Sequence, residues 1–237
     1  MSGKLTKLRF EDLLALKSLT AHQQDAIEAW DSGENLVLNG SAGTGKTFLG
    51  CSLGMHCVLS PDYPELKKLV IIRSVVPTRD IGFLPGDEDE KVAVYTTPYV
   101  QIFNKLCLGR KTDCYKRSEV NGQVEFEITS FLRGQTIDNA VVLIDEMQNC
   151  NGRELNTIMT RLGDDCRVIF AGDYYQSDFF RSDEKKSVIA FLKILENMTN
   201  FTEVRFGWKD IIRSGTVRDF IMTKERMIKD GEIDPDW

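Results

Sequence analysis

Long apolar runs are missing from the sequence. A helix that crosses a membrane needs about 20 consecutive apolar residues, and the least charged stretch, residues 48–60, is shorter than that and is interrupted by two glycines. Residues 1–10 carry three basic side chains but lead into no apolar segment of the kind that a secretory signal requires. We therefore expect no membrane association and no secretion.

Metal-binding and redox patterns are also scarce. The 237-residue chain has six cysteines without a C-x-x-C pair, and only two histidines. A structural zinc site needs four such ligands, usually in closely spaced pairs, so zinc is disfavoured. We predict reduced thiols and a cytoplasmic location.

An excess of positive charge is absent as well. Lysine and arginine total 30 against 36 for aspartate and glutamate, which gives a formal net charge of −6. A protein that coats nucleic acid through bulk charge is basic, so any nucleic-acid contact here must be local. The hydrophobic fraction of 42% is ordinary for a folded chain, and the length suits one large domain over residues 1–237.

Short apolar runs alternate with helical patterns along the chain. This alternation predicts an α/β fold with a mostly parallel sheet and helices on both faces. The expected strands are residues 35–38, 68–73, 140–145, 167–171 and 201–206. The expected helices are residues 21–30, 46–59, 91–108, 152–162, 186–197 and 216–229.

One segment, about residues 109–130, breaks the alternation. An Asn121-Gly122 turn precedes apolar residues at 124, 126 and 128, a pattern typical of an antiparallel β-hairpin. We therefore predict a hairpin insertion. Basic residues gather just before the Asn-Gly turn, a pattern that is usually a solvated face, with contact to a phosphate backbone as the alternative. They are Lys105, Arg110, Lys111, Lys116 and Arg117.

The strongest chemical signal is a glycine-rich loop between an expected strand and an expected helix. It fits G-x-x-x-x-G-K-[ST], a phosphate-binding pattern whose backbone N–H groups and helix N-terminus attract phosphate oxygens. Lys46 would reach the β- and γ-phosphates, and Thr47 offers a hydroxyl to Mg²⁺. The predicted nucleotide-binding residues of the loop are Gly40, Ser41, Ala42, Gly43, Thr44, Gly45, Lys46 and Thr47.

Two acidic residues mark the end of the expected strand at 140–145. We expect Asp145 to face the phosphate loop and to hold Mg²⁺ together with Thr47. Glu146 is placed to polarise an attacking water, which favours hydrolysis over transfer to another acceptor. The structural alternatives are a cap for Asp145 and solvent exposure for Glu146.

Two glutamines complete the predicted site. Gln176 follows the expected strand at 167–171 and would orient the water or sense the γ-phosphate. Gln23 lies at the start of the first expected helix, and its amide is a candidate reader of the adenine edge. Each has an ordinary alternative, as a turn residue for Gln176 and as a solvated helix start for Gln23.

These motifs together resemble a known group. The set L-T-x-x-Q-x-x-A-I, G-x-x-x-x-G-K-T, D-E-x-Q-N and G-D-x-x-Q resembles the RecA-like core of superfamily 1 helicases, with Gln148 among the matching positions. Two more segments, I-G-F-L-P-G-D at residues 81–87 and F-L-R-G-Q-T at residues 131–136, are similar to the PhoH-like family. The resemblance covers about residues 17–225.

The resemblance implies a RecA-like P-loop ATPase of bacteria or their phages that uses ATP and Mg²⁺ in the cytoplasm. It also implies coupling to single-stranded RNA or DNA. Since a helicase motor uses two RecA-like domains, we expect a homo-oligomer here, with a hexamer as one form, and no membrane partner. Arg213, in a segment that resembles the family's C-terminal motif, is the candidate γ-phosphate arginine, in cis or in trans, and Arg73 and Arg133 are weaker candidates.

The main hypothesis is therefore Mg²⁺-dependent ATP hydrolysis, with Lys46, Glu146, Gln176 and Arg213 as the catalytic residues. GTP is disfavoured because the guanine-reading N-K-x-D pattern does not occur. The rival is a nucleotide-switched assembly module with little hydrolysis, which a nucleotide titration of oligomer size would distinguish. A P-loop phosphotransferase and a ribonuclease are further alternatives.

Overall fold

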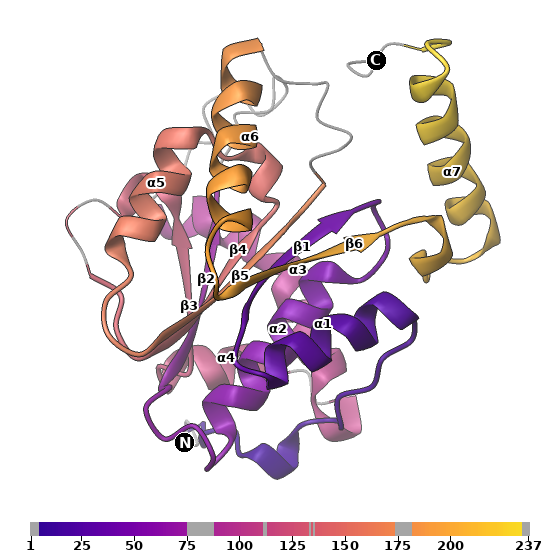
Figure 1. Cartoon of the computed structure of the whole chain (residues 1–237). Coiled ribbons are helices and arrows are strands. Elements are labelled where there is room, and N and C mark those ends of the chain that lie inside the picture. The colour runs from indigo at the N-terminus through magenta and orange to yellow at the C-terminus, as the bar shows by residue number, and fades with distance from the viewer. Residues whose placement is uncertain are drawn as a thin grey trace.

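A six-stranded sheet is the centre of the molecule in the computed structural model, which describes residues 5–74, 88–110, 113–132, 134, 136–173 and 182–233. The strands lie in the order β3-β2-β4-β5-β1-β6, and all five neighbouring pairs are parallel (Figure 1). Their bounds are β1 (Asn35–Gly40), β2 (Lys68–Arg73), β3 (Val124–Ile128), β4 (Ala140–Asp145), β5 (Cys166–Gly172) and β6 (Phe201–Phe206). The predicted parallel α/β sheet is confirmed.

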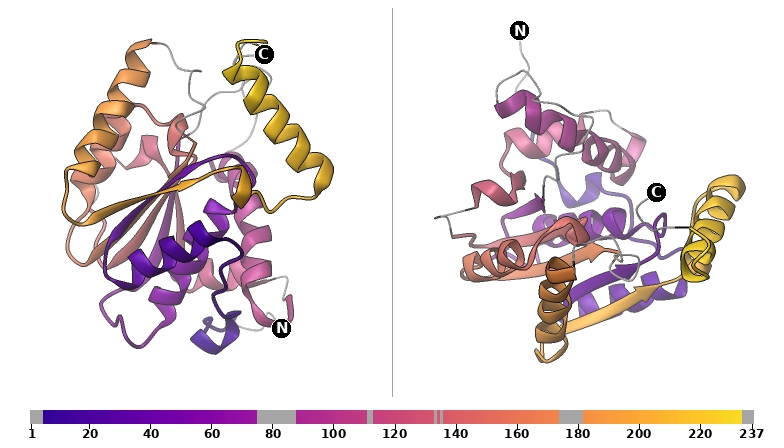
Figure 2. Two further views of the ribbon diagram at one scale, coloured as in Figure 1. Left: turned by 45° about the vertical axis from the view of Figure 1, so that its right-hand side comes forward. Right: turned by 90° about the horizontal axis from the view of Figure 1, so that it is seen from above.

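Helices cover both faces of this sheet, as predicted. Their bounds are α1 (Ala21–Asp31), α2 (Lys46–Leu59), α3 (Glu88–Leu106), α4 (Cys114–Val120), α5 (Gly152–Arg161), α6 (Ser182–Glu196) and α7 (Gly215–Lys229). One hydrophobic core joins α1, α2, α3 and α4 to the sheet, and a second joins α5 and α6 to its other face. Helix α7 lies apart from both layers and contains no buried residue (Figure 2).

The central strands are buried on both faces because helices pack on each side. All six residues of β4 are buried. Helix α2 approaches the sheet closely, and a Cβ at Gly50 would lie 2.7 Å from Cδ1 of Leu143, while one at Gly54 would lie 2.7 Å from Cδ1 of Leu69. These two glycines therefore let the helix that begins at the phosphate loop lie directly on β4 and β2.

The predicted hairpin at residues 109–130 is wrong. Residues 114–120 form helix α4, and Val124–Ile128 form β3, which pairs in parallel with β2 at the edge of the sheet. The Asn121-Gly122 turn joins α4 to β3, with Gly122 at φ 67°. Alternating apolar residues were misleading here, because an edge strand of a parallel sheet alternates as a hairpin strand does.

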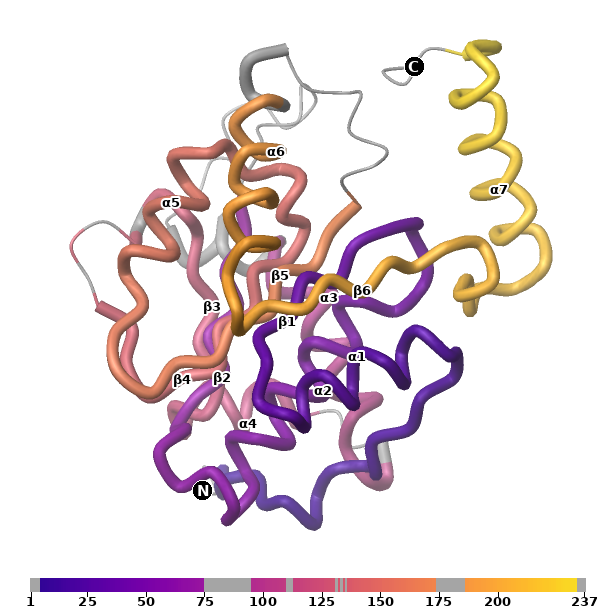
Figure 3. The backbone as a smooth tube through the Cα atoms, viewed as in Figure 1, coloured from indigo at the N-terminus to yellow at the C-terminus, as the bar shows by residue number. Residues whose placement is uncertain are grey.

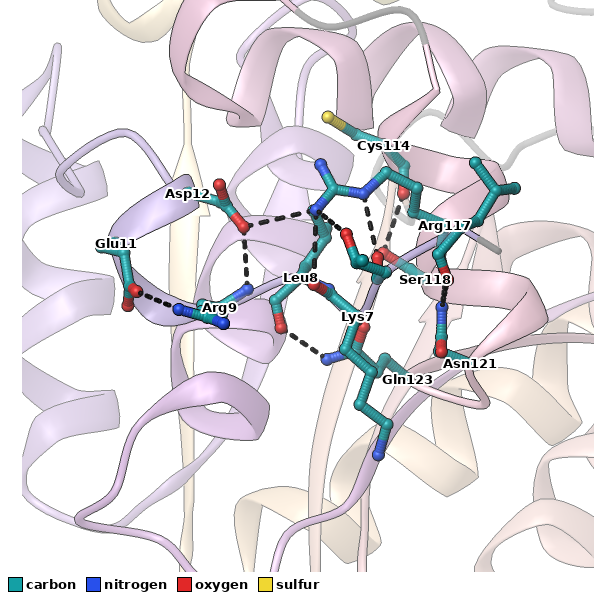
Figure 4. Close-up of polar contacts among 12 residues, drawn as sticks. Lys7, Leu8, Arg9, Glu11, Asp12, Cys114, Arg117, Ser118, Asn121 and Gln123 are labelled. Atoms are coloured by element: carbon teal, nitrogen blue, oxygen red, sulfur yellow. Dashed lines mark hydrogen bonds and ion pairs between the residues drawn. The ribbon is translucent and has the colours of Figure 1, made fainter. Parts of the chain in front are cut away.

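One residue of the basic segment, Arg117, is not available to a phosphate backbone. Arg117 is buried and donates hydrogen bonds to the carbonyls of Thr6 (3.0 Å) and Lys7 (3.3 Å), and Gln123 bonds both the N–H and the carbonyl of Leu8 (Figure 4). Figure 3 shows this N-terminal segment at the end of the molecule away from the β1–α2 loop. Arg117 therefore anchors the N-terminal segment to α4 and β3.

Membrane-spanning elements were not expected. In the described ranges, none of the helices combines the length and the apolar character that a bilayer crossing requires.

Candidate nucleotide and metal site

The glycine-rich loop connects β1 to α2 at the carboxyl ends of the strands. Gly40 has φ 130°, and a Cβ there would lie 1.9 Å from the Phe206 carbonyl oxygen, so only glycine fits between β1 and β6. Gly45 precedes α2 with φ 84°. Positive φ angles at glycines are typical of loops that turn successive N–H groups toward a bound anion.

Lys46 turns its ammonium into this loop. Its Nζ donates hydrogen bonds to the carbonyls of Gly40 (2.6 Å) and Ser41 (2.8 Å). Burial lowers the pKa of Lys46, and the nearby carboxylates, Asp173 foremost, oppose that shift. The loop thus holds a cation whose nearest partners are neutral carbonyls that an anionic phosphate could replace.

Thr47 and Asp145, the predicted metal pair, meet across α2 and β4. The Thr47 hydroxyl donates to Oδ1 of Asp145 at 2.8 Å. Burial raises the pKa of Asp145, the neighbouring Glu146 adds to the rise, and hydrogen bonds from Tyr99 and Thr47 oppose it. The structure therefore brings a hydroxyl and a buried carboxylate together beside the phosphate loop.

These oxygen atoms fit Mg²⁺. Magnesium is a hard cation that is usually held by one or two protein carboxylates, with phosphate oxygens and waters in the other positions. Among the described residues, no group of three or more histidine, cysteine, aspartate and glutamate side chains gathers into a denser metal site. A metal here would therefore depend on Thr47, Asp145 and a nucleotide.

Glu146 follows Asp145 in a left-handed conformation, with φ 50° and ψ 43°. Left-handed backbone is uncommon for a residue with a side chain, and it turns Glu146 out of the strand direction. The Gln148 amide donates to Oε2 of Glu146, and its oxygen accepts the N–H of Asp173 at 3.1 Å. Gln148 therefore links the glutamate after β4 to the end of β5.

Gln23 is buried and bonded to backbone at both ends of its amide. Its oxygen accepts the N–H of Leu19 at 2.8 Å, and its nitrogen donates to the Thr44 carbonyl at 2.9 Å. The solvated alternative is thus wrong. In this arrangement Gln23 supports the phosphate loop, and its contact with adenine stays a prediction.

Arg213 lies against the loop in the same chain. The N–H of the preceding residue, Ile212, donates to the Gly43 carbonyl at 3.1 Å. A Cβ at Gly43 would lie 2.8 Å from Cγ of Arg213, so glycine leaves room for this side chain. The segment after β6 therefore brings Arg213 to the nucleotide loop, while its contact with a γ-phosphate stays a prediction.

A buried carboxylate holds that segment in place. Asp210 accepts a hydrogen bond from the Gly207 N–H at 2.9 Å, and its Oδ2 lies 2.7 Å from Nδ1 of His22 on α1. Burial raises the pKa of Asp210, but the hydrogen bonds from Gly207, His22 and Thr20 outweigh burial and leave it below the usual value. Asp210 thus ties the start of α1 to the end of β6.

Two residues at the site were not predicted. The Glu225 carboxylate on α7 accepts the Ser41 hydroxyl at 3.0 Å and the Trp208 indole N–H. The Tyr99 hydroxyl on α3 donates to Oδ2 of Asp145 at 2.7 Å. Neither residue lies in a recognisable sequence motif. A glutamate on an amphipathic helix is typical of the protein surface, and a tyrosine in a helix is typical of the hydrophobic core.

Several predicted positions lie outside the described residues, namely Gln176, Arg133 and most of the two family-specific segments. Their roles stay predictions. Arg73 is described, and its place in β2 is in register with Asp145 in β4, at the carboxyl ends of the strands.

Comparison with known proteins shows the family of this chain. The family model described as PhoH-like protein matches residues 15–225. Protein PhoH of Escherichia coli strain K12 is 32% identical over 203 residues, which cover 85% of this chain and 55% of that protein. A PhoH-like protein of Synechocystis is 29% identical over 224 residues, covering 94% of this chain and 65% of its own length.

A solved structure with a similar fold is the large terminase of a thermophilic bacteriophage. Its TM-score is 0.50 at 12% sequence identity, over 89% of this chain and 50% of that one. At this identity the likeness concerns the fold alone, a RecA-like P-loop domain. The chain spans between about half and two thirds of the two PhoH-type relatives.

Proposed function

This chain belongs to the PhoH-like protein family, and from that premise we propose that it binds Mg²⁺-ATP and hydrolyses it. The observation that carries the proposal is the meeting of Thr47 and Asp145, at 2.8 Å, beside the Lys46 loop. A phosphate loop alone only binds an anion, whereas a hydroxyl and a carboxylate next to it add a place for the metal that accompanies a triphosphate.

In this proposal the loop amides and Lys46 hold the phosphates. Lys46 exchanges its bonds to the Gly40 and Ser41 carbonyls for β- and γ-phosphate oxygens. Thr47 and Asp145 would hold Mg²⁺, which would supply positive charge near the phosphates, where negative charge develops. Partial burial strengthens these interactions because bulk water screens them less.

Glu146 orients the attacking water. The water oxygen forms the new bond to the γ-phosphorus while the bond from phosphorus to the bridging oxygen of ADP breaks, and the water proton is accepted by Glu146 and passed to the released phosphate. Gln148 supports this role because its amide holds Oε2 of Glu146. Gln176 and Arg213 are proposed to contact the γ-phosphate, Arg213 in cis because it packs on Gly43.

We further propose single-stranded RNA or DNA as the partner that stimulates hydrolysis, and a homo-oligomer such as a hexamer as the working form. The support is the resemblance of the motif set to superfamily 1 helicase cores. Arg117 of the basic segment does not support the idea, since its side chain is buried against the N-terminal segment.

A second candidate, a nucleotide-switched assembly module, is favoured by one observation. Helix α7 contains no buried residue, yet its Glu225 bonds Ser41 in the phosphate loop. A nucleotide that changes the loop would therefore also change the position of an exposed helix. The two candidates differ in turnover, which is fast in the first and slow in the second.

Phosphate release tests the proposal. We expect wild type to release phosphate from Mg²⁺-ATP, faster with single-stranded RNA or DNA, and Glu146→Gln to lose this activity while it still binds ATP. The matched control is Glu119→Gln, an exposed carboxylate paired with Lys116 on α4, which should behave as wild type. Binding of ATP without release by wild type would reject the ATPase and favour the assembly module.

A further inference from the structure

Asp145 is a nearly inaccessible carboxylate, 4% exposed, whose two oxygens have different partners. Oδ1 accepts the Thr47 hydroxyl at 2.8 Å, and Oδ2 accepts the Tyr99 hydroxyl at 2.7 Å. The carboxylate is therefore held from both sides, with one side facing the residue that shares the proposed metal.

Tyr99 is completely buried in α3, with 0% exposure, and its ring packs on Phe126 of β3 with centroids 5.5 Å apart. The ring alone explains the packing, and a phenylalanine would satisfy it. The hydroxyl adds something else, because a phenolic donor 2.7 Å from a buried carboxylate oxygen is a short, charge-assisted hydrogen bond.

We propose that Tyr99 is a positioning residue for the metal site. Its hydroxyl holds Oδ2 of Asp145 so that Oδ1 stays directed at Thr47, where Mg²⁺ would bind. The inference rests on the proposed Mg²⁺-ATP function and extends it to a residue that carries no motif.

The physical reason is the freedom of the carboxylate. Rotation about the last side-chain bond of aspartate is soft, so a carboxylate without fixed partners adopts a range of orientations. Removal of the Tyr99 hydroxyl would also leave a buried oxygen without a donor, which is costly. Both effects reduce the fraction of molecules in which Asp145 is ready for the metal, as is found for outer partners of metal ligands.

Tyr115 offers a matched control. It is 4% exposed, and its ring packs edge-on against Phe103 with centroids 5.3 Å apart. Its hydroxyl is buried and finds no hydrogen-bond partner within the described part of the chain. Tyr115→Phe therefore also removes a buried phenolic oxygen from the same hydrophobic core, but it changes no hydrogen bond of Asp145.

The test measures binding rather than turnover. Affinity for a fluorescent ATP analogue is measured for wild type, Tyr99→Phe and Tyr115→Phe, first in EDTA and then across a Mg²⁺ titration. We expect Tyr99→Phe to weaken the apparent Mg²⁺ affinity by about 10-fold or more, with its affinity in EDTA unchanged. Tyr115→Phe should follow wild type in both conditions.

Three results would overturn the inference. The first is a Tyr99→Phe protein with the wild-type Mg²⁺ dependence, and the second is an equal loss in both variants, which would assign the effect to packing. The third is a wild type that binds the analogue without any Mg²⁺ dependence, which rejects the proposed function as well and so is distinguishable from the other two. Circular dichroism of each variant shows the fraction that is folded, and the Mg²⁺ dependence is compared per folded molecule.

Discussion

Two cations, the half-buried Lys46 and the buried Arg117, lie toward opposite ends of the parallel strands, and both donate to backbone carbonyls. Lys46 bonds Gly40 and Ser41 in the phosphate loop, and Arg117 bonds Thr6 and Lys7 in the N-terminal segment. Each end also has a glutamine whose amide bonds backbone atoms through both its oxygen and its nitrogen. The two ends therefore use the same polar groups.

The difference lies in what surrounds each cation. Arg117 is matched by Asp12, whose carboxylate lies 3.5 Å away, and its segment is closed around it. Lys46 sits in a loop of positive-φ glycines with several carboxylates at longer range. A buried cation that is paired with a carboxylate has a structural role. A cation that is bonded only to neutral carbonyls, in a loop that presents N–H groups, can exchange those carbonyls for an anion.

The sharpest way to test this comparison is Lys46→Ala. We expect ATP hydrolysis to fall by about 100-fold or more, because a preorganised positive charge at the phosphates is lost. The free energy of unfolding should change little, since the cost of burying the ammonium offsets what its neutral carbonyl partners contribute. Phosphate release and urea unfolding on the same preparation measure both. A variant with full activity would contradict the assignment of the loop.

Arg117→Met should show the opposite profile. Loss of the hydrogen bonds to the Thr6 and Lys7 carbonyls and of the ion pair to Asp12 should lower the free energy of unfolding by about 3 kcal/mol. Affinity for the nucleotide should stay at the wild-type value in the fraction that remains folded. Urea unfolding measures the first quantity, with exposed Arg218→Met of α7 as the control. A stable Arg117→Met with weakened nucleotide binding would reverse the comparison.

Asp210→Asn should give a smaller and pH-dependent effect. Because the folded pKa of Asp210 lies below its usual value, its carboxylate stabilises the fold above the unfolded pKa of about 4, and that stability is lost as pH falls through the folded pKa. We expect the free energy of unfolding of wild type to exceed that of Asp210→Asn by about 2 kcal/mol at pH 7. This difference should disappear below about pH 4.

Urea unfolding across this pH range measures the gap. The control is Asp25→Asn on the exposed side of α1, which makes the same chemical change away from the contacts of Asp210. A gap of constant size for Asp210→Asn would show that the side chain acts through its shape and not through its charge.

The smallest expected effect concerns Glu225. Its carboxylate bonds Ser41 in the loop, where a negative charge repels an incoming triphosphate through partly screened electrostatics. We expect Glu225→Gln to bind ATP about threefold more tightly, a fraction of 1 kcal/mol. Fluorescent-nucleotide titration measures this, with exposed Asp219→Asn on α7 as the control. Equal tightening in both variants would indicate a general effect of net charge.

Local patterns were a good guide wherever a function needs contiguous residues. The loop at residues 40–47, the pair of Asp145 and Glu146, and five of the six strands were predicted from spacing and alternation. The hairpin was wrong because a two-residue period indicates a half-buried strand but does not show which strand it pairs with. The same pattern fits an edge strand such as β3.

The sequence by itself determined the residue types of the phosphate loop and the succession of strands and helices, because both depend on residues that are close along the chain. Tertiary structure alone decided which distant side chains complete them. Tyr99 is 46 residues from Asp145, Ser41 is 184 from Glu225, and Arg117 is 111 from Thr6. Periodicity shows that a face is buried, but only the packing of whole elements decides which group it meets.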